Sequence, residues 1–152
     1  MINQTLCTSF KRQLMLGVHD FRVTGGDVFK VALYTSAASL GADTIQYTTA
    51  GECVGAGYTA GGATLTNMGV LSTGGDVSFT SFPNVTFPNV TLTARAALVY
   101  NTTPSAANNS NIPLLNPAVC VLDFGEEKTV VAKDFTIVFP AFAANTALIR
   151  IA

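Results

Sequence analysis

The most obvious shortage in this sequence is charge. Only 11% of its 152 residues are Asp, Glu, Lys or Arg and 49% are hydrophobic, whereas ordinary soluble proteins carry roughly 25% charged residues. The net charge is −1, and Lys11-Arg12 is the one adjacent pair of basic residues, so no nucleic-acid-binding surface is expected. Thr, Ser, Asn and Gly must cover the surface instead. Such a surface favours packing against copies of the same chain or a partner, with an uncharged monomer as the alternative.

Long apolar runs are also missing, although the mean hydropathy is +0.41. No stretch approaches the roughly 20 consecutive apolar residues that span a bilayer, and the first residues lack the basic and apolar regions of a secretion signal. Neither membrane contact nor export is therefore expected. The cysteines Cys7, Cys53 and Cys120 are odd in number and show no C-x-x-C spacing. They predict reduced, buried thiols of a protein made in a cytoplasm.

Residues for catalysis or metal binding are few as well. His19 is the only histidine, and no sequence signature connects it to a Ser or Cys nucleophile. The nine carboxylates are scattered; Asp27 and Asp76 follow Gly-Gly pairs, where an Asp usually bonds its own turn. The sequence leaves open whether two carboxylates lie close together in space, as the catalytic acids of glycosidases do. The sequence assigns no catalytic, cofactor-binding or metal-binding residue, and we do not expect an enzyme.

Glycine, by contrast, is concentrated in GECVGAGYTAGGATLT at 51–66. Its G-x-G-x-x-x-G pattern is similar to the loop that holds a pyrophosphate in dinucleotide-binding proteins. That loop needs a helix beginning at its glycines, whereas the residues that follow here alternate as in a strand. No cofactor is therefore expected. We predict instead that Gly57, Gly61 and Gly62 have special backbone, with positive φ or close backbone approach.

The hydrophobic spacing predicts an all-β fold with one short N-terminal helix. Apolar residues recur near the helical period at Phe10, Leu14, Val18 and Phe21. Thr8 or Ser9 is the expected cap, and Gly17 the expected stop. We expect a single domain over 1–152, with a helical arm at 1–22 and a β domain at 23–152.

About eight strands are predicted, a number typical of a β-sandwich or jelly-roll-like barrel. They are expected at 27–35, 46–49, 63–66, 77–82, 90–101, 118–124, 130–139 and 146–152. A hairpin turn at 125–128 is predicted to join two of them. The repeated FPNVT at 82–86 and 87–91 predicts an edge or a bulged bend, because proline cannot donate to a central ladder.

The segment 101–117 is the longest one without a predicted element, and a loop of this length is either a contact loop or a flexible tip. Its apolar residues would be costly to expose, so we expect its second half to pack on something. With the helix, it supplies our candidate interface residues, which are Phe10, Leu14, Asn108, Ile112, Leu114 and Leu115.

Several segments resemble small virion structural proteins of tailed bacteriophages. They are CTSFKRQLMLGVHDF at 7–21, KVALYTS at 30–36, YTTAGECVGAGYTAGGATL at 47–65, VLDFGEEK at 121–128 and FTIVFP at 135–140. The resemblance implies a virion protein made in the host cytoplasm, present in many copies and bound to the major capsid protein or other virion proteins. The resemblance assigns no catalytic residue to this chain.

Within this resemblance, a capsid decoration (cement) protein that self-associates is the first expectation. A compact chain without a fibrous or coiled-coil segment suits the surface of a shell. A tail-associated or receptor-binding protein is the alternative, and an enzyme comes third.

Overall fold

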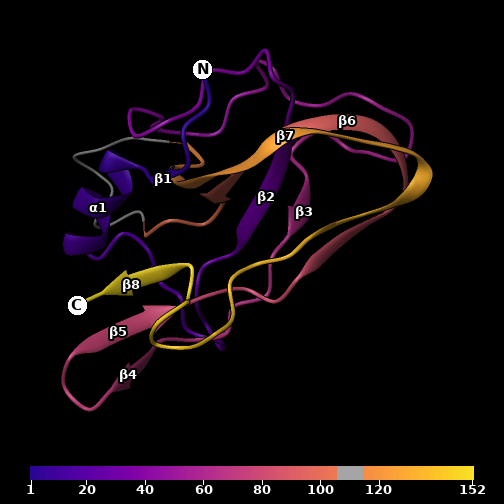
Figure 1. Cartoon of the computed structure of the whole chain (residues 1–152). Helices are drawn as coiled ribbons and strands as arrows, with labels where there is room; N and C mark the ends of the chain where they lie inside the picture. The colour runs from indigo at the N-terminus through magenta and orange to yellow at the C-terminus, as the bar shows by residue number, and fades with distance from the viewer. Residues whose placement is uncertain (106–114) are drawn as a thin grey trace.

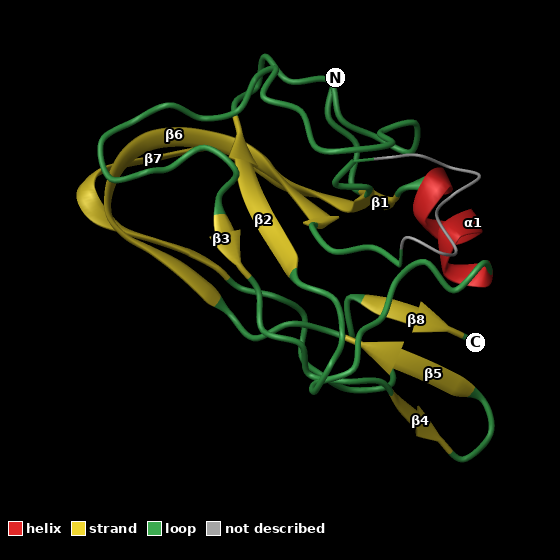
Figure 2. Ribbon diagram, turned by 180° about the vertical axis from the view of Figure 1, so that it is seen from behind, coloured by secondary structure: helices red, strands yellow, loops and turns green. Residues whose placement is uncertain are grey.

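The computed structural model describes residues 1–105 and 115–152 (Figure 1). Within these residues two antiparallel sheets and one short helix confirm the predicted all-β, sandwich-like fold. The larger sheet contains, in spatial order, β1 (Thr5–Leu6), β7 (Ala118–Ile137), β6 (Val85–Asn101), β2 (Phe29–Tyr34) and β3 (Ala63–Thr64). The smaller contains β4 (Leu71–Thr73), β5 (Val77–Thr80) and β8 (Ile149–Ile151). Figure 2 shows the helix α1 (Thr8–Met15) beside β8, at the end where the chain terminates.

The helix is shorter than its apolar pattern suggested. Cys7 occupies the N-cap position without a side-chain cap bond, so the predicted cap at Thr8 or Ser9 is wrong. Gly17 follows the last turn with a φ of 70°, which confirms the predicted stop. Phe10 is completely buried in the same core as the large sheet, and β1 pairs with β7. Residues 1–22 thus pack as part of the β structure.

The longest feature of the fold is the ribbon of β6 and β7, which pair from Val85 with Ile137 to Tyr100 with Ala118. Figure 1 shows this ribbon bending back on itself at the end remote from α1. The register shifts between Phe87 and Val90, and Asn89 between them has a φ of 48°. The bulged bend predicted from FPNVT is therefore confirmed.

The predicted hairpin at 125–128 is wrong. Segment 118–137 is one continuous strand, and both of its halves pair with β6. Ala94 lies opposite Lys128 and Ala96 opposite Asp123, so the four residues 124–127 bulge out of the strand opposite the single residue Arg95. Glycine with a positive φ serves a bulge as well as a hairpin turn. Here both halves of the segment pair with β6, and this pairing produces a bulge in place of a hairpin turn.

The shorter strands differ from the prediction mainly in length. Four predicted segments appear as the shorter β2, β3, β5 and β8. The segment predicted at 46–49 contributes only an isolated bridge between Gln46 and Pro117. β1 and β4 were not predicted, because two or three residues are too few to show a period.

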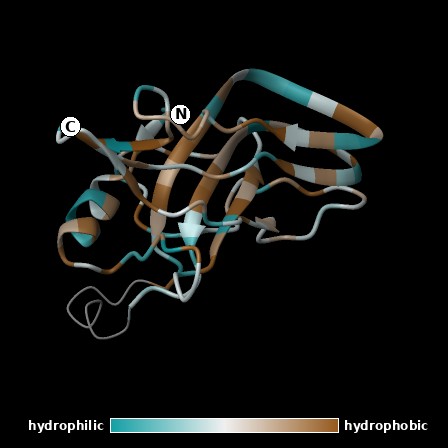
Figure 3. Ribbon diagram, turned by 90° about the horizontal axis from the view of Figure 1, so that it is seen from below, coloured by the Kyte–Doolittle hydropathy of each residue, from teal (hydrophilic) through white to brown (hydrophobic). Residues whose placement is uncertain are grey.

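Phenylalanine rings form one cluster within the core. Phe21 stacks on Phe29 with ring centroids 4.4 Å apart, and Phe82 packs at 5.7 Å from Phe29 and 5.8 Å from Phe139. Figure 3 shows apolar residues along the strands in the middle of the molecule. Burying one such ring contributes about 1.5–3 kcal/mol, so this cluster holds the segments around Phe21, Phe82 and Phe139 against β2.

Candidate functional site

The glycine-rich segment crosses the large sheet with its backbone pressed against the strands. Gly57, Gly61 and Gly62 have φ values of 79°, 90° and 72°, which confirms the predicted special backbone. A Cβ on Gly57 would lie 2.5 Å from the Asn89 carbonyl oxygen, and one on Gly62 would overlap the carbonyl oxygen of Val31. The next element is β3, as the alternation predicted. The segment therefore serves close backbone packing.

The same segment carries a buried carboxylate, Glu52, that sequence reasoning counted among scattered acids. Glu52 is 8% exposed. The Tyr47 hydroxyl donates to its Oε2 at 2.6 Å, and the Tyr58 hydroxyl donates to its Oε1 at 2.8 Å. The Gly61 N–H donates to Oε1 at 2.7 Å. Three donors on one carboxylate compensate for its burial.

All four tyrosines of the chain belong to this region. Tyr100 stacks on Tyr47 with ring centroids 4.7 Å apart and donates its hydroxyl to the Gly61 carbonyl oxygen at 2.6 Å. The Tyr34 hydroxyl donates to the Thr48 carbonyl oxygen at 2.6 Å. Burial, followed by the charge of Glu52, raises the pKa of Tyr100 to about 12. The hydroxyls stay protonated donors at neutral pH, and the cluster clamps the loop onto the sheet. We call Glu52, Tyr47, Tyr58 and Gly61 the Glu52 clamp.

His19 lies in a second buried network, under the end of α1. Its Nε2 is 2.9 Å from Gln13 Oε1, and its Nδ1 is 3.0 Å from Asn101 Nδ2. Asn101 Nδ2 also donates to Asp27 Oδ2 at 2.7 Å. The amide donor assigns Nδ1 as acceptor and places the proton on Nε2. Burial lowers the pKa of His19 to about 4, so the ring is neutral near pH 7.

The three cysteines are buried and unpaired, as predicted. Burial raises the pKa of Cys7 and of Cys53 to about 12 and raises that of Cys120 even further. Thiols held protonated in this way are weak nucleophiles. His19 has its two ring nitrogens committed to amide groups, so its hydrogen bonds are not directed at a thiol.

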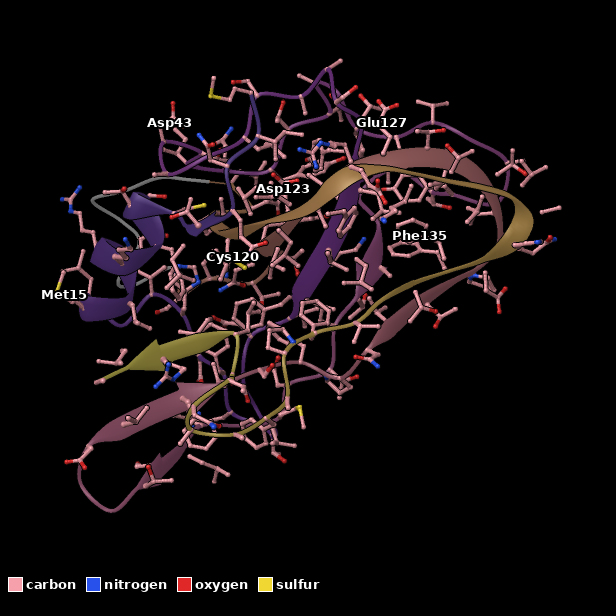
Figure 4. The ribbon with its side chains drawn as sticks, viewed as in Figure 1. Met15, Asp43, Cys120, Asp123, Glu127 and Phe135 are labelled. Atoms are coloured by element: carbon pink, nitrogen blue, oxygen red, sulfur yellow. The ribbon has the colours of Figure 1, made fainter. Side chains whose placement is uncertain are left out.

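An open cavity of about 580 Å³ lies in the bend of β7. Phe124 and Phe135 come from the two arms of the bent strand, with ring centroids 5.8 Å apart. Asp123 at the rim forms an ion pair with Arg95, and each side chain is about a fifth exposed. Figure 4 shows Asp123, Glu127 and Phe135 along this strand. A cavity of this size and lining fits an apolar group of a ligand or partner.

The candidate interface residues differ in how far they are exposed. Phe10 is completely buried in the chain's own core, so its side chain is not on the surface where a partner would bind. Leu14 is half-buried, and Leu115 is 76% exposed. Asn108, Ile112 and Leu114 lie outside the described residues.

Within residues 1–105 and 115–152 no group of three or more His, Cys, Asp and Glu side chains is arranged to hold a metal ion. No helix in this part of the chain is long and apolar enough to cross a membrane. Comparison with known protein families, curated proteins and solved structures gave no match.

Proposed function

We propose that this chain is a structural virion protein of a tailed bacteriophage, acting as a capsid decoration protein that stabilises the shell through many copies of one contact. The observation that carries the proposal is the apolar surface. Thirteen large apolar side chains are exposed in the described residues. Three of them, Met15, Val70 and Ile151, line two adjoining clefts beside α1 and the small sheet. Grouped exposed apolar residues are typical of a protein–protein contact.

The proposed mechanism is mass action. A subunit that binds the assembled shell but not the separated capsid proteins stabilises the shell, by about 2.7 kcal/mol per site when its concentration is 100 times the Kd. A rigid subunit loses little conformational freedom on binding. The Glu52 clamp and the glycines packed against the sheet supply such rigidity.

Deletion of the coding sequence from the phage genome tests this function. We expect particles that assemble but release DNA at lower temperature, and restoration when purified protein is added back. Quantitative gels of wild-type virions should show a copy number comparable with that of the major capsid protein. A few copies per particle, or unchanged particle stability, would contradict a decoration role.

A tail-associated, receptor-binding role is the second candidate, and a hollow lined in part by polar side chains favours it. The hollow, of about 340 Å³, is lined by Asp43, Thr44, Gln46 and Thr48, among others. Hydroxyl, amide and carboxylate groups of this kind hydrogen-bond sugar hydroxyls. Under this role, soluble protein would block adsorption of the phage to its host, and a Gln46→Ala variant would block less well.

A further inference from the structure

We infer that copies of this chain associate head to tail, with the acidic free edge of β7 in one copy docked into a basic cleft between α1 and β8 in the next. This inference deepens the proposed function, and rests on it, by naming the surfaces of one many-copy contact. Two separate features of the structure carry it, one at each end of the molecule.

The first feature is the cleft between α1 and β8, with a volume of about 410 Å³. Leu14 and Met15 line it from the helix, and Ile149 and Ile151 line it from the strand. Figures 1 and 2 both show β8 between α1 and β5. Among the described residues β8 pairs only with β5, so its other edge, on the side of α1, has no strand partner. The cleft thus combines apolar walls with unpaired backbone groups.

The rim of this cleft is basic. Lys11 on α1 and Arg150 on β8 are exposed and line the cleft, and the exposed Arg12 is next to Lys11 in the chain without lining it. Arg150 Nε donates to the backbone carbonyl oxygen of Ala144. None of the three forms an ion pair with another described residue, and no Asp or Glu is among the residues that line the cleft. An occupant with acidic side chains and an apolar face is therefore complementary to it.

The second feature is the outer edge of β7. From Leu122 to Ile137 this strand pairs with β6 alone, because β1 covers only Cys120 and Val121. The Asp123 N–H donates instead to the side chain of Gln4, with a distance of 3.3 Å to Gln4 Oε1. The chain's own β1 shows that this edge accepts an extended antiparallel segment, and most of the edge is left without one in the described residues.

The charges on this edge are opposite in sign to those of the cleft. Between residues 123 and 134 β7 carries four acidic side chains and two lysines. Asp123 pairs with Arg95 and Glu126 with Lys128, so Glu127 and Asp134 are the acids of this stretch without an ion pair among the described residues. Glu127 is exposed on the bulge and accepts a hydrogen bond from Ser36. Asp134 is exposed on the lower arm of the bend. The outer edge of β7 therefore has the negative charge that an occupant of the basic cleft needs.

The two surfaces cannot meet within one chain. Figure 4 shows Met15 at one end of the molecule and Glu127 and Phe135 towards the other. A contact between unlike surfaces is heterologous, and it builds a ring or an open row of subunits. A lipid surface fits less well, because the hydrocarbon interior offers no hydrogen-bond partner for the free backbone groups of β8. A second strand edge supplies those partners.

Sedimentation velocity of the purified full chain over a range of concentrations tests the inference. We expect dimers and larger species at high concentration, with weaker association at high salt. Arg150→Glu and Glu127→Lys should each weaken association by about tenfold. Mixing the two variants should restore it, because the reversed cleft of one then faces the reversed edge of the other. Asp76→Lys, an equal charge reversal in the β4–β5 turn, is the matched control and should leave association unchanged.

Circular dichroism and thermal melting of each variant show whether it is folded. A monomer at every concentration, association indifferent to both reversals, or no recovery in the mixture would overturn the inference. Binding of the monomer to phosphatidylglycerol vesicles that is lost in Arg150→Glu would instead assign the cleft to a lipid surface. None of these outcomes alters the copy number in virions, so the proposed function is tested separately.

Discussion

Because His19 is buried and neutral, we predict that the protein loses stability at acid pH. His19 is 7% exposed, and burial lowers its pKa from 6.5 to about 4. The unfolded chain therefore binds a proton below pH 6.5 that the folded chain takes up only near pH 4. The free energy of unfolding should fall between these two pH values. The full loss from this one group is about 3 kcal/mol, a large part of a typical domain's stability.

The hydrogen bonds around the ring explain why protonation is unfavourable. A proton on Nδ1 would point at Asn101 Nδ2, which is itself a donor. The Asn101 amide cannot simply rotate, because its Oδ1 accepts the N–H of Thr103 and its Nδ2 donates to Asp27. Rotating the amide to accept the new proton would remove both of these bonds, including the donor to the Asp27 carboxylate. Charging His19 thus breaks bonds at the end of β6.

The assay is urea unfolding at pH steps from 7.5 to 3.5, for the wild type and for His19→Gln. Glutamine retains a donor towards Gln13 but does not titrate, so the difference between the two curves isolates the histidine. We expect the advantage of the wild type to shrink by about 3 kcal/mol as the pH falls from 6.5 to 4. A difference that stays constant with pH would refute the reasoning. Nuclear magnetic resonance of the ring should show no titration above pH 5.

The remaining predictions concern the glycine segment, the clamp and the thiols. Gly62→Ala should destabilise the fold by more than about 2 kcal/mol in urea unfolding, whereas Gly125→Ala, with a similar φ but open space, should cost only about 1 kcal/mol. Glu52→Gln should cost about 1–3 kcal/mol in the same assay, because its amide nitrogen would face a hydroxyl donor. Cys53 should react with a thiol reagent only as fast as the protein unfolds; rapid labelling of the native state would contradict its burial.

Much of the fold was predictable wherever apolar residues recur over many positions. Strand 90–101 alternates for twelve residues and lies within the observed β6. Its register against β7 was not predictable, because the bulge opposite Arg95 depends on a partner strand far along the chain. A local turn signal describes only the backbone of its own residues. The same glycine and acidic residues therefore suggested a hairpin that does not exist.

The candidate site was predictable only in its backbone. The density of glycines predicted positive φ at Gly57, Gly61 and Gly62, because this conformation is a property of each residue type. The Glu52 clamp was not predictable, since Tyr47, Glu52 and Tyr58 meet only after the loop has turned across the sheet. Of the two candidate interface residues on α1, Leu14 lines the cleft, whereas the side chain of Phe10 is completely buried in the core.

The proposed head-to-tail contact and the Glu52 clamp lie in separate parts of this chain, so their effects on association and on stability can be measured separately. The Glu52 clamp holds the glycine segment on the large sheet, and Arg150 stands on the small sheet at the rim of the cleft. Mutations at sites without shared partners have nearly additive effects. Glu52→Gln should therefore lower the free energy of unfolding and leave the association constant of the folded chain unchanged. Arg150→Glu should weaken association and lower the free energy of unfolding only slightly, through loss of the exposed hydrogen bond from Arg150 Nε to the Ala144 carbonyl oxygen. If Glu52→Gln also abolished association in fully folded protein, the glycine segment would itself belong to the contact, and the head-to-tail geometry would have to be redrawn around it.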